Sequence, residues 1–355
     1  MSQKQTMPNR AIYLAIATAA FATPPVLATP DDLFEWATIT HAGNTGYDRD
    51  TVNPYLTGRG SVAYDYRIAR DEVSSGQFVT FLNTFTTQSD ELAARIRPPL
   101  TWGGEIDHSY SGPGVRYKLR TDVAHADRLP ILATDWRSAA YFVNWMNNDL
   151  SSDPSAIEDG AYDASTFGGS PPTGGFTDQS TRHADARYWI PSMDEWLKAA
   201  HYDPNKNGQD QGGWWIYNNG SDTPLVGGPP GAGDTSAGWV VDDDGRPAWE
   251  TPLGSYPQTV SPWGLRDVSG GGGEWTETWI PYNDNLTDRI WMGAPAGSLS
   301  WADDATYFGS DYPTSRGFNL SFRVASTVPS PASIVALCGV ILHQSTRKRS
   351  RCESS

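Results

Sequence analysis

Two carboxylates flank a run of four glycines in the segment from Ser261 to Trp279. Asp267 precedes the glycines and Glu274 follows them, and tryptophans lie on both sides. Glycine lets the backbone turn its carbonyl oxygens toward a bound ion, and calcium takes six to eight oxygen ligands from carboxylates and carbonyls. The pattern is therefore typical of a hard-cation site. An aromatic-flanked β-turn between strands is the alternative, because glycine-rich turns far outnumber ion sites.

Three stretches have the apolar spacing of amphipathic helices. They run from Val73 to Phe85, from Asp135 to Leu150 and from Pro191 to Ala200. A serine at 74 or 75 can cap the first, and the proline that opens the third suits a first helical turn with acidic residues just after it. The chain also holds 35 glycines and 26 prolines, which favour turns and short strands. We therefore expect an α+β domain with few helices, short strands and much irregular structure.

Four segments resemble, in the same order, the signatures of the formylglycine-generating enzyme family, also called the sulfatase-modifying factor family. They read EVSSGQFVTFLN (72–83), DWRSAAYFVNW (135–145), YWIPSMDEWLKAA (188–200) and GLRDVSGGGGEWTETW (264–279), with a closing FRVA (322–325). The resemblance implies a variant of the C-type-lectin-like fold. Because the motifs span one unit and no internal repeat is visible, we expect a single domain over residues 29–328.

The resemblance also implies a metal. In that family the corresponding loop holds a structural calcium ion, which assigns side-chain ligands to Asp267 and Glu274 and backbone carbonyl ligands to Gly270 and Gly272. A structural calcium is therefore the expected cofactor.

Enzymes of the family bind copper and oxidise a substrate cysteine with two active-site cysteines, because thiolates are the soft ligands that select Cu(I). This chain contains only Cys338 and Cys352, and both lie beyond the expected domain. The aligned register puts the missing cysteines near Trp301 and Thr306. Copper and formylglycine-generating oxidase activity are therefore not expected.

Both ends of the chain have the pattern of export signals. Residues 1–28 combine basic Lys4 and Arg10, an apolar run and a small-residue cleavage site, which predicts a secretory signal peptide; a buried N-terminal helix is the alternative. Residues 329–355 resemble the bacterial PEP-CTERM sorting signal, which an exosortase reads. We expect an exported protein, extracellular or at the cell surface, with transient membrane contact through this tail.

The formal net charge of −15 argues against a nucleic-acid partner. The sequence has no GxSxG or HxxxH pattern, so no catalytic residue is assigned. We expect non-catalytic recognition of a peptide or glycan in the groove that holds substrate in the family's enzymes. Trp301, Tyr307 and Phe308 either line this groove or belong to the core. Two alternatives stay open: an enzyme with a different active site, and a structural component of the extracellular matrix or cell surface.

Overall fold

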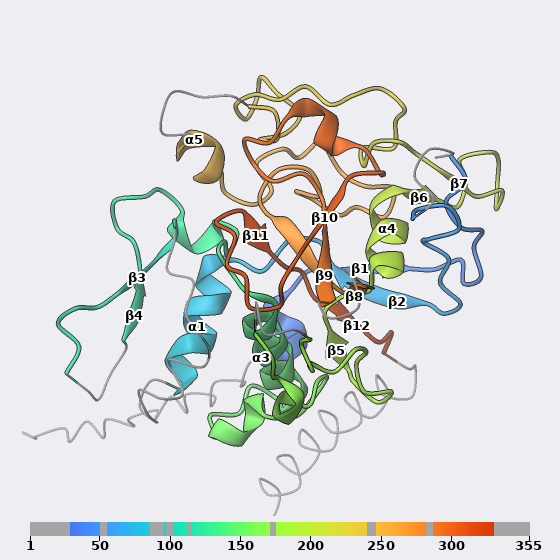
Figure 1. The fold of residues 1–355 in the computed structure, drawn as a ribbon. Helices are drawn as coiled ribbons and strands as arrows, with labels where there is room; N and C mark the ends of the chain where they lie inside the picture. Colours follow the sequence, from blue (N-terminus) through green and yellow to red (C-terminus); the bar gives the residue numbers. More distant parts are fainter. Residues whose placement is uncertain are drawn as a thin grey trace, which may run out of the picture.

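The computed structural model describes residues 29–49, 55–85, 96, 102–111, 116–170, 175–239, 246–281 and 287–329. These residues form an α+β domain with few helices, short strands and long irregular segments (Figure 1). The expected fold class is confirmed. The predicted signal peptide, and the sorting signal beyond residue 329, lie outside the described residues. Among the described helices, none has the length and apolar character needed to cross a membrane.

The three expected helices are present, and polar caps set where each begins. In α1, the Ser74 hydroxyl accepts a hydrogen bond from the Gln77 backbone N–H at 3.3 Å, and in α3 Asp135 accepts one from Ser138. Ser192 caps α4 in a reciprocal capping box. These caps satisfy backbone N–H groups that have no partner inside the helix. The helices are α1 (Ser75–Phe85), α3 (Trp136–Asn147), α4 (Met193–His201) and the short α5 (Arg246–Trp249).

Two helix boundaries differ from the expectation. α3 ends at Asn147 rather than at Leu150, because Asp149 and Leu150 adopt left-handed backbone angles with φ of 53° and 59°. Pro191 lies before the capping residue of α4 and not in its first turn. The apolar pattern therefore located the helices, and local backbone geometry fixed their ends.

The strands form two four-stranded sheets and two short hairpins. One sheet has the order β1-β2-β12-β5 and is antiparallel. The other has the order β10-β9-β8-β11, in which only β11 pairs in parallel. The strands of the two sheets are β1 (Trp36–Ile39), β2 (Tyr66–Ala69), β5 (Tyr188–Trp189), β8 (Gly273–Pro281), β9 (Thr287–Met292), β10 (Phe308–Asp311), β11 (Leu320–Ser321) and β12 (Ala325–Ser326). The hairpins are β3 (Gly104–Ile106) with β4 (Tyr117–Leu119) and β6 (Tyr202–Asp203) with β7 (Gly213–Trp214).

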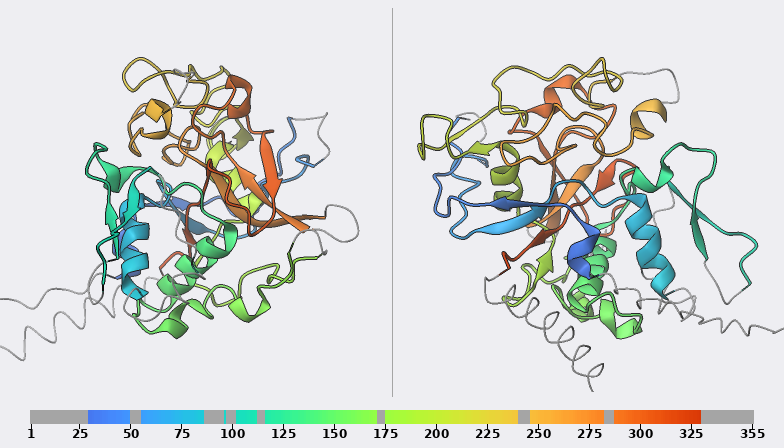
Figure 2. Two further views of the ribbon diagram at one scale, coloured as in Figure 1. Left: turned by 60° about the vertical axis from the view of Figure 1, so that its left-hand side comes forward. Right: turned by 180° about the vertical axis from the view of Figure 1, so that it is seen from behind.

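Five short 3₁₀ turns complete the described elements. They are η1 (Pro30–Leu33), η2 (Ala126–Arg128), η3 (Pro154–Ile157), η4 (Ala164–Thr166) and η5 (Ser300–Asp303). The views in Figure 2 place the irregular loops of residues 205–239 at the end of the domain opposite α3, and η5 lies with these loops in Figure 1.

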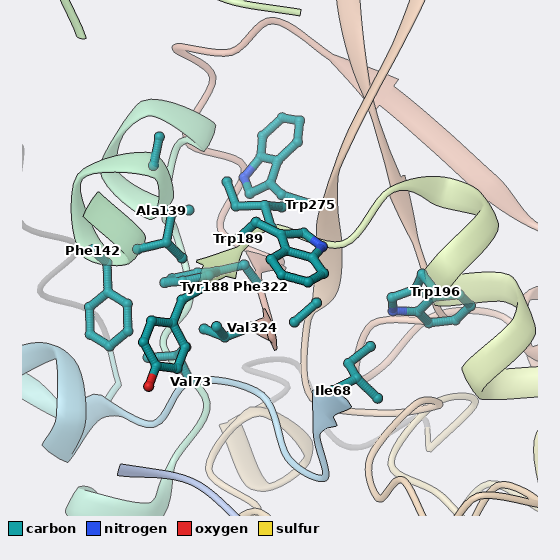
Figure 3. Close-up of a cluster of buried hydrophobic side chains, with 14 of the residues drawn as sticks. Ile68, Val73, Ala139, Phe142, Tyr188, Trp189, Trp196, Trp275, Phe322 and Val324 are labelled. Carbon is teal, nitrogen blue, oxygen red and sulfur yellow. The ribbon is translucent and has the colours of Figure 1, made fainter. Parts of the chain in front are cut away.

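An aromatic core joins α1 and α3 to the strands. Phe142 of α3 stacks on Phe78 of α1 at 5.8 Å between ring centroids and meets Phe322 edge-on at 5.5 Å. Trp275 of β8 is completely buried and donates its indole N–H to the Thr134 carbonyl at 2.7 Å (Figure 3). Burial of each such side chain contributes about 1.5–3 kcal/mol. The motif segments therefore converge on one core, which holds the loops of the opposite end in place.

Candidate functional site

The glycine run after Asp267 forms a tight turn over a buried carboxylate. Gly270 and Gly271 have φ of 94° and 64°, angles that other residues rarely adopt. The Gly272 backbone N–H donates to the Glu72 carboxylate at 3.0 Å. A Cβ atom on Gly271 would lie 2.2 Å from a Glu72 oxygen. Gly271 is thus required because Glu72 occupies the space that a side chain would fill. A Cβ atom on Gly272 would likewise lie 2.4 Å from the Ser321 Cβ atom.

The acid that follows the glycine run belongs to a buried ion pair. Glu274 and Arg323 are both fully buried, and Arg323 donates to both Glu274 oxygens through Nε and Nη2. The Trp196 indole N–H also donates to Glu274, at 2.8 Å. Burial, reinforced by the charge of Glu274, raises the pKa of Glu72 well above its ordinary value. Glu274 therefore carries the charge that pairs with Arg323, and the raised pKa of Glu72 favours its neutral form.

Asp267, the first acid of the loop, has a separate partner. Its φ is 52°, and its carboxylate accepts a hydrogen bond from the Gly254 backbone N–H at 2.6 Å. Burial raises the pKa of Asp267 to about 7. Gly270 donates its N–H to the Ala294 carbonyl at 2.8 Å.

These partners do not fit a calcium site that uses both carboxylates. Calcium needs six to eight oxygen ligands, but Arg323 already binds both oxygens of Glu274 and would repel a cation beside them. Among the described residues, no group of three or more Asp, Glu, His or Cys side chains has a metal-binding arrangement. Calcium binding by Asp267, Gly270, Gly272 and Glu274 stays a prediction, and the geometry gives Glu274 a structural role in the ion pair.

The positions aligned with the family's cysteines lie on and beside η5. Trp301 is 62% exposed on this turn, and Leu299 just before it is 61% exposed. Thr306 is half-buried and bonds to Asp304. Cys338 and Cys352 lie outside the described residues. An exposed indole thus stands near the position where the family's enzymes carry a thiolate.

Two of the three predicted groove aromatics contact each other. Trp301 meets Tyr307 edge-on at 5.3 Å, and Tyr307 meets Trp291 at 5.7 Å. Phe308 is half-buried in β10 and contacts Tyr55 instead. Trp301 is therefore the exposed member, Tyr307 supports it, and Phe308 belongs partly to the core.

A second group of aromatic residues extends this surface, and the sequence motifs did not reveal it. Trp102 and Trp249 stack with ring centroids 6.2 Å apart, and Phe318, which is 62% exposed, meets Trp249 at 5.4 Å. A Cβ atom on Gly297 would lie 3.7 Å from Trp249, which places this group beside the start of η5. These side chains come from segments far apart in sequence, so only the fold brings them together. We call Leu299, Trp301, Tyr307, Trp102, Trp249 and Phe318 the aromatic surface.

Buried polar residues hold η5 under the aromatic surface. The Ser269 hydroxyl donates to Asp303, the last residue of η5, and lies 2.9 Å from the Thr235 hydroxyl. Burial raises the pKa of Asp303 to about 6, although the Ser269 hydrogen bond opposes this shift. The second Asp303 oxygen has no partner among the described residues. Ser269 belongs to the glycine segment, so that segment fixes the turn that carries Trp301.

Comparison with solved structures finds several similar proteins. The Treponema denticola variable protein 1 matches with a TM-score of 0.50 and 15% identity, over 82% of this chain and 95% of that protein. CarF matches with a TM-score of 0.46, 17% identity and coverage of 86% and 100%. PvdO from Pseudomonas aeruginosa matches with a TM-score of 0.43, 14% identity and the same coverage. At these identities the likeness concerns the fold alone.

No curated protein sequence matches this chain significantly. The family of the sulfatase-modifying factor enzyme 1-like domain, by contrast, matches residues 39–328. This range contains all of the motif segments identified in the sequence and both four-stranded sheets except the start of β1. The family resemblance and its fold are thereby confirmed, and the chain belongs to the sulfatase-modifying factor enzyme 1-like domain family.

Proposed function

We propose that this protein is an exported, non-catalytic member of its family that recognises a peptide or a glycan. The observation that carries the proposal is the exposure of Trp301, 62% of whose surface is accessible near the position of the family's missing cysteines. Large apolar side chains that gather at a surface are typical of interaction sites. The aromatic surface brings several of them together over one end of the domain.

The part of the chain that matches the family contains no cysteine, although oxidation by the family's enzymes needs two. The two cysteines of the chain, Cys338 and Cys352, both follow the matched range of residues 39–328. A soft copper site of two thiolates therefore cannot form within the domain. The absence of cysteine from the matched range supports ligand binding in the groove without oxidation of the ligand.

Aromatic side chains suit both proposed ligand classes. Trp and Tyr offer large contact areas with little conformational entropy to lose on binding, and their faces pack against sugar rings, prolines and aliphatic side chains. Asp303 favours an enzyme as the second candidate, because a buried carboxyl with a raised pKa and one oxygen without a partner among the described residues is typical of functional sites. The exposed indole favours binding over this alternative.

A glycan and peptide array probed with the purified protein tests the proposal. Trp301→Ala should lose the signal, because the exposed indole contributes contact area rather than core packing. Val226→Ala is the matched control, since Val226 is 60% exposed outside the aromatic surface. The proposal is contradicted if no array compound loses its binding in Trp301→Ala, or if an array compound is turned over.

A further inference from the structure

A second concave site lies away from the aromatic surface. A pocket of about 550 Å³ opens between the segment 180–184, the start of α4 and the far half of β8. None of its lining residues belongs to the aromatic surface. Its volume is in the range of small-molecule sites, which run from roughly 300 to 1,000 Å³. The site is thus large enough for a compact ligand.

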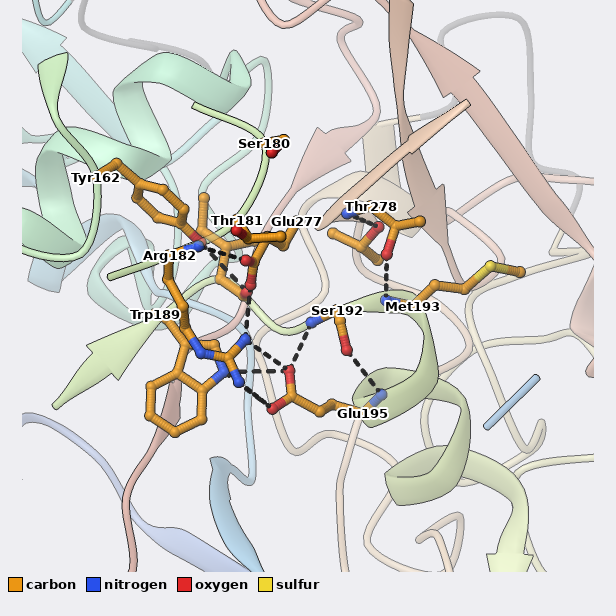
Figure 4. A network of polar contacts seen from close by, with 12 residues as sticks. Tyr162, Ser180, Thr181, Arg182, Trp189, Ser192, Met193, Glu195, Glu277 and Thr278 are labelled. Atoms are coloured by element: carbon orange, nitrogen blue, oxygen red, sulfur yellow. Dashed lines mark hydrogen bonds and ion pairs between the residues drawn. The ribbon is translucent and has the colours of Figure 1, made fainter. Parts of the chain in front are cut away.

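The floor of this pocket is a rigid polar network centred on Arg182 (Figure 4). The guanidinium group lies 4.2 Å from the Trp189 ring centroid and forms ion pairs with Glu195 at 2.9 Å and Glu277 at 2.7 Å. Its Nη2 also donates to the Tyr64 hydroxyl at 2.8 Å. Each of these groups is held by at least one partner, so the floor is preorganised before a ligand arrives.

Polar groups around this floor remain available to a ligand. The hydroxyls of Ser180 and Thr181 are exposed and make no hydrogen bond to another described residue. Trp279 stacks over Arg289 at 3.8 Å and lines the pocket with part of its ring. Tyr64 adds an aromatic ring that is 45% exposed at the rim. The pocket therefore combines exposed hydroxyl groups and aromatic faces.

The charges around the pocket cancel. Arg182 and Arg289 supply two guanidinium groups, and Glu195 and Glu277 supply two carboxylates. His183 at the rim pairs with Asp159 at 3.2 Å. An anionic ligand would be repelled by both carboxylates, and a cationic ligand would be repelled by both guanidinium groups. In either case the ligand would lose its hydration without gaining an unpaired charge of opposite sign as a partner. A neutral polyhydroxyl ligand meets neither penalty, because its hydroxyls can both donate and accept.

We propose that the pocket between Thr181, Glu277 and Trp279 binds a neutral sugar, with a sugar ring against the aromatic rim and its hydroxyls bonded to the polar floor. This site is independent of the aromatic surface. The hydroxyls of Ser180 and Thr181 and the carboxylate of Glu277 bond to the sugar hydroxyls. Such charge-assisted and neutral hydrogen bonds, together with an aromatic face, give orientation and selectivity.

Saturation-transfer NMR on the full chain tests this site with methyl glycosides of glucose, galactose, mannose and N-acetylglucosamine. At least one should bind saturably below about 10 mM. Thr181→Val removes a hydroxyl at constant shape, and Ser180→Ala removes the neighbouring hydroxyl. Each change should weaken that glycoside about five- to tenfold, the effect of one lost hydrogen bond.

The controls separate this site from the aromatic surface. Thr223→Val changes an exposed threonine elsewhere and should leave the affinity unchanged, as should Trp301→Ala. A glucuronate or glucosamine probe should bind about tenfold more weakly than the neutral glycoside, because its charge is uncompensated. The assignment is overturned if no neutral glycoside binds, if a charged probe binds as tightly, or if Thr181→Val binds like the unchanged protein. Loss of sugar binding in Trp301→Ala would move the sugar to the aromatic surface.

Discussion

An ion pair between Glu274 and Arg323 and a calcium site at Glu274 predict different effects of mutation and of calcium removal on stability. Both side chains are fully buried and joined through two hydrogen bonds. Removing one partner of a buried pair leaves an uncompensated charge, which costs about 3–5 kcal/mol. In Arg323→Met, Glu274 loses its cation while the Glu72 carboxyl lies nearby. We expect Arg323→Met to lower the free energy of unfolding by an amount at the upper end of this range, and Glu274→Gln to lower it somewhat less.

Thermal unfolding followed by circular dichroism measures the effect. At about 2 °C per kcal/mol for a domain of this size, Arg323→Met should lower the melting temperature by roughly 8–10 °C. Glu274→Gln should lower it equally in millimolar calcium and in chelator, because Arg323 is the partner that it loses. A Glu274→Met, Arg323→Met double variant should be more stable than the sum of the single effects predicts, since no buried charge is left unpaired.

The reasoning fails if the cost of Glu274→Gln disappears in chelator. That result would make Glu274 a calcium ligand, as the family resemblance implies, and the ion pair would be secondary. A melting temperature of Arg323→Met within 1–2 °C of the unchanged protein, which corresponds to about 1 kcal/mol or less, would equally refute the ion pair's structural role.

Three further predictions address protonation, chemistry and processing. Burial raises the pKa of Asp303 to about 6 from an unfolded value of 3.8, so the folded state binds the extra proton. The stabilisation from this group is complete below the unfolded pKa and is lost as pH rises through about 6, a total loss of about 2–3 kcal/mol in the free energy of unfolding. Urea titrations across this pH range should show a smaller loss for Asp303→Asn. An unchanged pH dependence would show that Asp303 is not its source. Purified protein supplied with copper and oxygen should leave a cysteine-containing sulfatase peptide unmodified by mass spectrometry, and any aldehyde above a no-enzyme control contradicts this. Exported protein should begin near Thr29 and carry no thiol that reacts after denaturation, whereas peptides containing Cys338 or Cys352 in the secreted fraction would show that the tail is retained.

The sequence predicted the helices and the family because both depend on local patterns. The apolar spacing around Phe78 and Phe142 marks helix faces that pack on one another. The cap at Ser192 follows from its own type and that of Glu195 three residues later. Each signal lies within a few residues of the feature that it predicts.

The contacts of the glycine loop could not be predicted, because they join distant segments. Glu72 and Arg323 lie far from Glu274 in sequence, and their pairing depends on where β8, β11 and β12 meet. The same reason hid the stack of Trp102 on Trp249. A glycine run between two acids is compatible with a cation cage or with a turn over a carboxylate, and only the fold distinguishes them.

The exposed indole of Trp301 provides the most direct test of the proposed function. Calorimetric titration with the strongest array ligand should give a weaker affinity for Trp301→Ala by about 30-fold, the effect of roughly 2 kcal/mol for a central aromatic contact. Its melting temperature should stay within about 1–2 °C of that of the unchanged protein, because a side chain that is 62% exposed packs little. An affinity equal to that of the unchanged protein, in a folded Trp301→Ala variant, would contradict recognition through the aromatic surface.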